Sequence, residues 1–341
     1  MTRKQKRLLS VAVGIIISIV LLWVVFHKIS LTELIGVLVR VNYWWLVPNV
    51  ALVVLSLYQR AFRWRYMLDP IKRVPYPSLL ASTCIGFMAN NVLPLRLGEF
   101  VRAYSLSRQD PEISKSASLA TIFVERMVFD LMALLAILGG VFAMSTLPLT
   151  GTELGMSLEQ GTYLAVGVAL VGLIFVLFLA MKPELAGSLL VRYLFFLPAG
   201  IKHRIQEVVL RFSRGLEFMT DQVAIFWVGS HTLLIWIVMG LSNYFVFLAF
   251  GFELSLAASF ILLVIVSISI LIPSSPGFVG VYHAGVAFTL KLYGVPTDQA
   301  GAFALVLHAA QYIPVTAMGF YFLKTRHLSL KRLEEEAVEE M

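Results

Sequence analysis

The sequence has few charged residues. Asp, Glu, Lys and Arg make up 14% of its 341 residues, while 59% are hydrophobic and the mean hydropathy is +0.85. A soluble domain is normally about 25% charged. The composition therefore excludes an ordinary soluble protein and predicts an all-α integral membrane protein with several spans.

Cysteine is almost absent, since Cys84 is the single one and cannot form an internal disulfide. It lies in an apolar segment, where we expect a small buried hydrophobic side chain. The sequence contains no HExxH or CxxC pair and no GxxxxGK[ST] loop, so these metal-site motifs and a P-loop ATPase are excluded. No polar stretch is long enough for a separate catalytic domain. We therefore expect neither an enzyme nor a cofactor.

Basic residues outnumber acidic ones, 27 to 20, giving a net charge of +7. In a membrane protein such an excess marks cytoplasmic loops rather than nucleic-acid binding. The first apolar run has no small-residue cleavage pattern after it and is interpreted as a span. Most Lys and Arg residues fall on one side if both termini are cytoplasmic in a cell inner membrane. The six predicted spans are 8–26, 46–61, 117–144, 162–181, 223–250 and 300–323.

Two shorter features complete this organisation. Ser30 and Glu33 have capping-box spacing and predict a short helix in the outer interface after the first span. We assign 1–326 to one transmembrane domain and 327–341 to an acidic cytoplasmic tail.

The segment 79–93 is short for a crossing and ends at Pro94, which disfavours helix just before it. It suits a half-helix that returns to its own side. If a new helix starts after the proline, Arg96, Glu99 and Arg102 recur every third residue and form one charged stripe. A charge at membrane depth costs ~2.5–3.5 kcal/mol, so these side chains should face a partner or a polar cavity. The alternative is a cytoplasmic loop that binds headgroups nonspecifically.

A second break lies at 273–277, between apolar segments 256–272 and 278–292. Both breaks have a proline followed four residues later by glycine, Pro94 with Gly98 and Pro273 with Gly277. One segment would enter from inside and the other from outside, a pattern typical of inverted repeats with a site at the midplane. We therefore predict two re-entrant hairpins beside the six spans. The alternative is two proline-kinked spans and eight crossings.

The third predicted span carries Glu125, Arg126 and Asp130. Arg126 and Asp130 are four residues apart, which predicts an ion pair. Glu125 lies ~14 Å along the helix from Ser116, near mid-membrane. Arg96, Glu99, Glu125 and Arg126 could converge where the first hairpin packs on this span. They would form either a structural ion-pair network or a polar cavity in which arginines bind a phosphate.

Polar residues also follow the second break. Tyr282 and His283 are secondary candidates, with His308, Gln311 and Tyr312 in the last span. A single membrane histidine is more often packed and hydrogen-bonded than a ligand. The full set of candidate substrate-binding residues is Arg96, Glu99, Arg102, Glu125, Arg126, Asp130, Pro273, Ser274, Gly277, Tyr282 and His283.

Three stretches resemble the flippase-like integral membrane family, which includes the membrane domain of lysylphosphatidylglycerol synthases. They are NNVLPLRLGEFVRAYSLSR, ATIFVERMVFDLMALL and IPSSPGFVGVYHAGVAF. The synthases add an aminoacyl-transferase domain, so with the sequence ending at Met341 lipid aminoacylation is not expected. The residues that the resemblance places in the family's common core are Arg96, Glu99, Arg102, Glu125, Arg126, Pro273 and Gly277.

We therefore expect a flippase that moves an anionic phospholipid or a polyprenyl-phosphate-linked lipid through a polar groove between the hairpins. A second hypothesis is a lipid-phosphate phosphatase with Ser274, Ser275 or His283 as nucleophile or base. A third is a lipid-binding scaffold that does not transport. The expected partners are the lipid itself and either a second copy of the chain or a partner enzyme.

Overall fold

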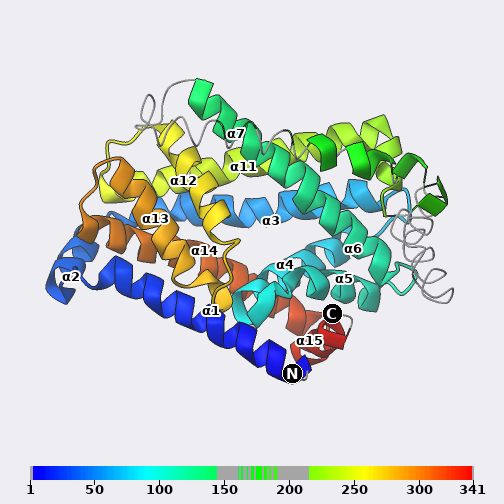
Figure 1. Ribbon diagram of the computed structural model, residues 1–341, viewed down its shortest axis with the longest axis horizontal. Coiled ribbons are helices and arrows are strands. Elements are labelled where there is room, and N and C mark those ends of the chain that lie inside the picture. The colour runs from blue at the N-terminus through cyan, green and yellow to red at the C-terminus, as the bar shows by residue number, and fades with distance from the viewer. Residues whose placement is uncertain are drawn as a thin grey trace.

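The computed structural model describes residues 3–143, isolated positions between 160 and 189, and residues 215–339. Every regular element in these ranges is helical, which confirms the predicted all-α class (Figure 1). A π-helical segment, Glu125–Asp130, joins α6 to α7, and two short 3-10 turns, η2 (Pro94–Arg96) and η5 (Pro276–Phe278), interrupt the hairpins. The α-helices are α1 (Arg3–Phe26), α2 (Leu31–Arg40), α3 (Leu46–Leu68), α4 (Tyr76–Val92), α5 (Gly98–Gln109), α6 (Lys115–Val124), α7 (Leu131–Ala143), α11 (Gln222–Phe250), α12 (Leu256–Ser269), α13 (Val281–Leu292), α14 (Thr297–Thr325) and α15 (Leu330–Glu339).

Three helical stretches among the described residues are long and apolar enough to cross a membrane: Tyr43–Leu68, Gln222–Phe250 and Thr297–Thr325. A fourth crossing results if α1 and α2, which meet at a 78° bend, count as one broken span. These correspond to the predicted first, second, fifth and sixth spans. The predicted third span is α6, the π segment and α7, which carry its charges. The described positions of the predicted fourth span, 162–181, are helical. The loop before this span lies outside the described residues except at Gln160.

The bend between α1 and α2 follows from the sequence at Ser30. Its hydroxyl accepts a hydrogen bond from the Glu33 backbone N–H at 3.1 Å, and the Ser30 N–H donates to the Glu33 carboxylate at 3.0 Å. This reciprocal pair satisfies two free N–H groups at the start of α2. The predicted capping box and short helix are therefore confirmed.

The second predicted span is wrong at its C-terminal end. Helix α3 does not stop near Ala61 but continues to Leu68. Arg60 and Arg63, the latter beyond the predicted end of the span, are buried within it. Asn49, Ser56 and Arg63 are spaced by seven residues and so lie on one face of the helix. That polar face packs toward the interior of the bundle, so these basic residues lie inside the bundle and not on its surface.

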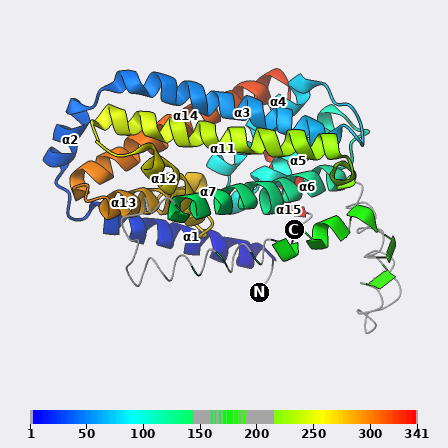
Figure 2. The ribbon, with the colours of Figure 1, turned by 90° about the horizontal axis from the view of Figure 1, so that it is seen from above.

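The long helices α3, α11 and α14 run along the longest axis of the molecule (Figure 1). Seen from above, α3 and α11 lie side by side, while α1 forms an edge of the bundle beside α13 (Figure 2). Asn49 of α3 donates to the backbone and hydroxyl oxygens of Ser242 in α11, at 2.8 and 2.7 Å. This buried pair of contacts fixes the register of the two helices.

The two predicted hairpins occupy opposite ends of the long axis, α4–α5 at the end labelled with α6 and α12–α13 at the end labelled with α2 (Figure 1). In each hairpin the two helices pack against each other, and η2 and η5 meet between them. The chain termini lie at the end of the molecule that carries α5.

Segment 327–341 contributes α15, which packs on the first hairpin through buried Leu333 and Ala337. Glu336 accepts hydrogen bonds from Arg108 and from Lys115, the latter at 3.1 Å. Partial burial raises the pKa of the Glu336 carboxyl, but these two hydrogen bonds outweigh it and lower that pKa. Helix α15 is thus held to the first hairpin by both apolar and charged contacts.

Candidate functional site

The two breaks have the same backbone geometry. In η2, Pro94 is followed by Leu95 (φ 65°) and Arg96 (φ 56°), and in η5, Pro276 is followed by Gly277 (φ 71°) and Phe278 (φ 59°). Two consecutive left-handed residues after a proline reverse the chain within a short turn. The equivalent prolines are therefore Pro94 and Pro276, and the predicted match of Pro94 with Pro273 is wrong by three residues.

The hairpin tips, which are the turns η2 and η5, touch through equivalent positions. The Arg96 guanidinium donates to the backbone oxygen of Ile270 at 3.0 Å, and its Cζ atom lies 5.3 Å from the centre of the Phe278 ring. Ile270 caps the C-terminal end of α12, where a cation is favourable. Since Arg96 and Phe278 both stand third in their turns, this contact joins like positions of the two hairpins.

Arg96 does not belong to the predicted charged stripe. It lies before the start of α5 in a left-handed conformation, so it is not on the helix that carries Glu99 and Arg102. Of the four groups predicted to converge, Glu99, Glu125 and Arg126 do so, and Arg96 instead reaches the second hairpin. The prediction assumed that helix resumes directly after the proline.

The first hairpin closes on two small residues. The Gly98 N–H donates to the Asn90 side-chain oxygen at 2.8 Å, which satisfies the start of α5. A Cβ atom on Gly98 would overlap the backbone oxygen of Gly86 and the Asn90 side chain. Gly98 therefore lets α4 and α5 approach closely, and Glu99 and Arg102 reach the π segment between α6 and α7.

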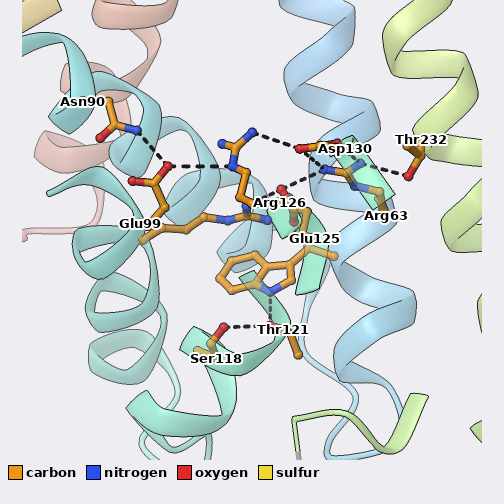
Figure 3. A network of polar contacts seen from close by, with 11 residues as sticks. Arg63, Asn90, Glu99, Ser118, Thr121, Glu125, Arg126, Asp130 and Thr232 are labelled. Carbon is orange, nitrogen blue, oxygen red and sulfur yellow. Dashed lines mark hydrogen bonds and ion pairs between the residues drawn. The ribbon is translucent and has the colours of Figure 1, made fainter. Parts of the chain in front are cut away.

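A buried ion-pair network lies where this hairpin meets α3 and the π segment (Figure 3). Arg63 pairs with Glu125 at 2.8 Å and with Asp130 at 2.6 Å, and Arg102 pairs with Glu125 at 2.9 Å. Arg63 and Glu125 have no exposed surface, and Arg102 is 2% exposed. Such charges stay buried only because each has an opposite charge in contact with it.

The network continues toward its more exposed side through Arg126. This guanidinium pairs with Asp130 at 3.1 Å, as predicted, and its Nε atom lies 3.7 Å from the Glu99 carboxylate. Glu99 also accepts from Asn90 at 3.3 Å. The side chains of Arg126 and Glu99 are 27% and 25% exposed, so they form the accessible edge of an otherwise enclosed cluster.

The π-helical segment brings two acids to one arginine. In an α-helix, residues five apart are turned by about 140° from each other. The i→i+5 bonding of a π-helix places them nearly above one another. Glu125 and Asp130 are five apart and both contact Arg63. The wider turn thus creates the acidic site that Arg63 occupies.

Sequence reasoning missed Arg63, which is central to this network. Besides its two acids, it donates to the Thr232 hydroxyl of α11 at 2.9 Å. The neighbouring Trp64 donates to Thr121 at 2.9 Å and lies under the Arg102 guanidinium, 4.0 Å from its Cζ atom. The heptad spacing of Asn49, Ser56 and Arg63 is the signal that could have identified it.

A second polar cluster surrounds the other tip. Tyr282 donates to Gln311 at 3.0 Å, the His308 Nε2 atom lies 2.9 Å from the Gly277 oxygen, and the rings of His283 and His308 are 4.8 Å apart. Gln311 in turn donates to Asn243 of α11 at 3.0 Å. The structure therefore brings Gly277, Tyr282 and His283 together, apart from the arginine network.

The remaining candidates lie at the edge of the second tip. Pro273 is exposed, and Ser274 lies against α1, where a Cβ atom on Gly14 would be 2.8 Å from its backbone oxygen. The next residue, Ser275, accepts a hydrogen bond from the Ser18 hydroxyl at 3.0 Å and donates its N–H to that hydroxyl at 2.9 Å. Helix α1 thereby holds the second hairpin in place.

Metal and cavity features lie apart from these clusters. The described residues include no group of three or more His, Cys, Asp or Glu side chains that could hold a metal. A cavity of about 670 Å³ lies at the end of α3, between α3 and the start of α11, and none of the network residues lines it. The buried part of the arginine network, with Arg63, Arg102 and Glu125, thus lies among packed helices away from this cavity.

The sequence is similar to proteins of several archaea. It is 27% identical to the Haloferax volcanii protein named glycosyltransferase AglD, over 98% of this chain and 57% of the relative, so it spans little more than half of that protein. It is 26% identical to a UPF0104 membrane protein of Methanocaldococcus jannaschii, over 72% of this chain and 98% of the relative. It is 27% identical to a UPF0104 membrane protein of Methanothermobacter thermautotrophicus, over 82% of this chain and 83% of the relative.

No solved structure matches the chain significantly. The model of the lysylphosphatidylglycerol synthase transmembrane region matches residues 11–319, which include both hairpins, the ion-pair network and most of α14. The expected resemblance is therefore confirmed. The chain belongs to the family of the lysylphosphatidylglycerol synthase transmembrane region, and it is a multi-pass membrane protein.

Proposed function

We propose that this protein translocates an anionic lipid across the cytoplasmic membrane. The observation that supports this most directly is the meeting of two broken helices with the same turn geometry. They come from opposite ends of the molecule beside a buried cluster rich in arginine. Discontinuous helices that meet near the midplane are typical substrate sites of secondary transporters.

The substrate we propose is an anionic glycerophospholipid or a polyprenyl-phosphate-linked lipid. Its phosphate would pass between the hairpins and contact the guanidinium groups of Arg96, Arg102 and Arg126, while its tails remain in the bilayer. Arginine suits this role because its planar fork makes two hydrogen bonds to phosphate oxygens. Glu99 and Glu125 orient these arginines through the ion pairs described above or carry a coupling proton.

The enclosed network corresponds to a closed conformation. Arg96 then acts as a contact between the tips, because it binds the last turn of α12 only when the hairpins meet. Movement of one hairpin away from the other breaks this contact and opens the space between them. Transport is facilitated, ion-coupled or driven by a partner, and both termini face the cytoplasm in this proposal.

The phosphatase hypothesis receives less support from the geometry. The Ser275 hydroxyl is engaged by Ser18, and the described contacts include no hydrogen bond between Ser275 and His283. A serine nucleophile needs a base within about 3 Å. Phosphate release from a lipid phosphate by the purified protein would support the phosphatase instead.

The test is a translocation assay in liposomes that contain a headgroup-labelled phosphatidylglycerol and an externally added quencher. Wild-type protein should expose the inner-leaflet label to the quencher, and Arg96→Ala should not. Arg65→Ala is a matched control, since Arg65 is 46% exposed and forms only a 3.8 Å surface pair with Asp69. Thermal unfolding of all three proteins verifies folding. Equal quenching with wild type and empty liposomes would contradict translocation of this lipid class.

A further inference from the structure

Arg60 is a buried cation without an ion pair. Its side chain projects from α3 one turn before Arg63, and the residue is 7% exposed. Among the described residues no carboxylate pairs with it, and its Nη1 atom has no hydrogen-bond partner. Its guanidinium lies over the ring of Phe87 of α4, whose centre is 4.9 Å from the Arg60 Cζ atom. The other buried arginines of the network all contact acids.

The charges around Arg60 do not balance. The cluster holds four guanidinium groups and three carboxylates, the latter from Glu99, Glu125 and Asp130. The cluster also has more buried hydrogen-bond donors without a partner than buried acceptors without a partner. Besides Arg60 Nη1, the Nε atom of Arg63 and the Nε and Nη2 atoms of Arg102 are buried without partners, whereas the corresponding acceptor is Glu125 Oε2 alone. The missing component is therefore an acceptor with negative charge.

Buried polar groups in native proteins are almost always hydrogen-bonded, and buried charges are paired. Phe87 offers a partial substitute because the face of an aromatic ring attracts a cation. The same ring also lies 5.2 Å from the Cζ atom of Arg126, which is 27% exposed. Phe87 thus connects the partly exposed edge of the network to the buried Arg60.

From this arrangement we infer that Arg60 is the primary binding group for the lipid phosphate, and that Arg126 lies on the path to it. This rests on the proposed function and deepens it. Arg63, Arg102 and Arg126 are already paired with carboxylates, so their charge is largely used within the protein. Arg60 retains a full charge and free N–H donors for a ligand. The bound phosphate completes the network by supplying the missing negative charge.

This assignment predicts an unusual response to mutation. Removal of a buried side chain normally lowers stability. Arg60→Gln instead removes an unpaired buried charge, so it should raise the unfolding temperature of the ligand-free protein in an uncharged detergent. The same change should weaken binding of the phosphate by ~10-fold to ~100-fold, since it deletes charge-assisted hydrogen bonds.

The experiment measures the unfolding temperature against added dihexanoyl phosphatidylglycerol, dihexanoyl phosphatidylcholine or inorganic phosphate. Wild type and Arg65→Gln should show a rise with phosphatidylglycerol that is larger than with phosphatidylcholine. Arg60→Gln should begin higher and show no such rise. Arg60→Lys keeps the charge but not the planar guanidinium, so its unfolding temperature should rise by a smaller amount with phosphatidylglycerol. This variant replaces Arg60→Gln in the experiment if Arg60→Gln does not fold.

Three outcomes would overturn the assignment. They are no rise of the wild-type unfolding temperature with phosphatidylglycerol, the same rise in Arg60→Gln as in wild type, or a rise with inorganic phosphate alone. The last would make the site one for free phosphate. The liposome assay keeps this inference separate from the proposed function. An Arg60-dependent rise without translocation refutes the translocator, whereas translocation with an unchanged rise in Arg60→Gln refutes the role of Arg60.

Discussion

At the scale of residues, Glu125 keeps two cations buried at once. Its Oε1 atom lies 2.8 Å from Arg63 and 2.9 Å from Arg102, and the residue has no exposed surface. Removal of one partner from a buried pair leaves an uncompensated charge, which costs much more than the pair itself contributes. The stability of the network should therefore depend strongly on the Glu125 carboxylate.

We predict that Glu125→Gln lowers the free energy of unfolding by ~3–5 kcal/mol, because Arg102 then loses its ion-pair partner and Arg63 keeps only Asp130. The measurement is denaturant or thermal unfolding in detergent. Glu335→Gln is the matched control, since Glu335 is 59% exposed and its pair with Lys331 measures 3.9 Å. It should change stability by less than about 1 kcal/mol. Similar losses in the two variants would show that the network is not the source of the effect.

The sequence predicted the local pair of this network but not its centre. Arg126 and Asp130 share one helix, so their spacing alone indicated the ion pair. Arg63 reaches the same acid from α3, 67 residues earlier in the chain. It lies beyond residue 61, where the second span was predicted to end, and only burial of the polar face of α3 places it inside the bundle.

At the scale of elements, the first hairpin depends on close packing of α4 against α5. Gly98 and Gly86 let the two backbones approach, and the Gly98 N–H binds the Asn90 side chain. The position of Arg102, which stacks on Trp64 and pairs with Glu125, follows from this approach. The hairpin and the network therefore form together.

We predict that Gly98→Ala and Gly139→Ala change stability in opposite directions. An added methyl group at Gly98 would overlap α4, which should cost ~1–3 kcal/mol or more. At Gly139 in α7 a Cβ atom meets nothing within 4 Å, so alanine should add ~0.5–1 kcal/mol through its higher helix propensity. Unfolding of the two variants beside wild type provides the comparison. Equal effects would contradict the proposed packing role of Gly98.

At the scale of the whole molecule, α1 holds the second hairpin while Arg96 connects it to the first. The Ser18 and Ser275 hydroxyl oxygens lie 3.0 Å apart, and a Cβ atom on Gly280 would be 2.6 Å from the Ser18 backbone oxygen. Transport as proposed requires one repeat to move against the other. A covalent link at this contact tests whether the second hairpin is the moving part.

We predict that Ser18→Cys with Ser275→Cys, in a Cys84→Ala background, forms a disulfide, because the two hydroxyl oxygens that the sulfur atoms would replace are only 3.0 Å apart. Oxidised protein should lose translocation in the liposome assay, and a reductant should restore it. Maleimide labelling of free thiols measures the extent of cross-linking, and each single-cysteine variant is a control. Full translocation with no free thiol remaining would show that this hairpin does not move relative to α1.

The sequence by itself determined the helical membrane class, the two proline breaks, the capping box and the family, because these depend on composition and on residues close in the chain. It did not determine the register of the hairpins or the burial of Arg60 and Arg63. The matching turns depend on left-handed backbone at Leu95 and Phe278, which no propensity predicts, and a π segment brings Glu125 and Asp130 together. Tertiary structure decided these features, because a buried charge is stable only where distant helices supply its partners.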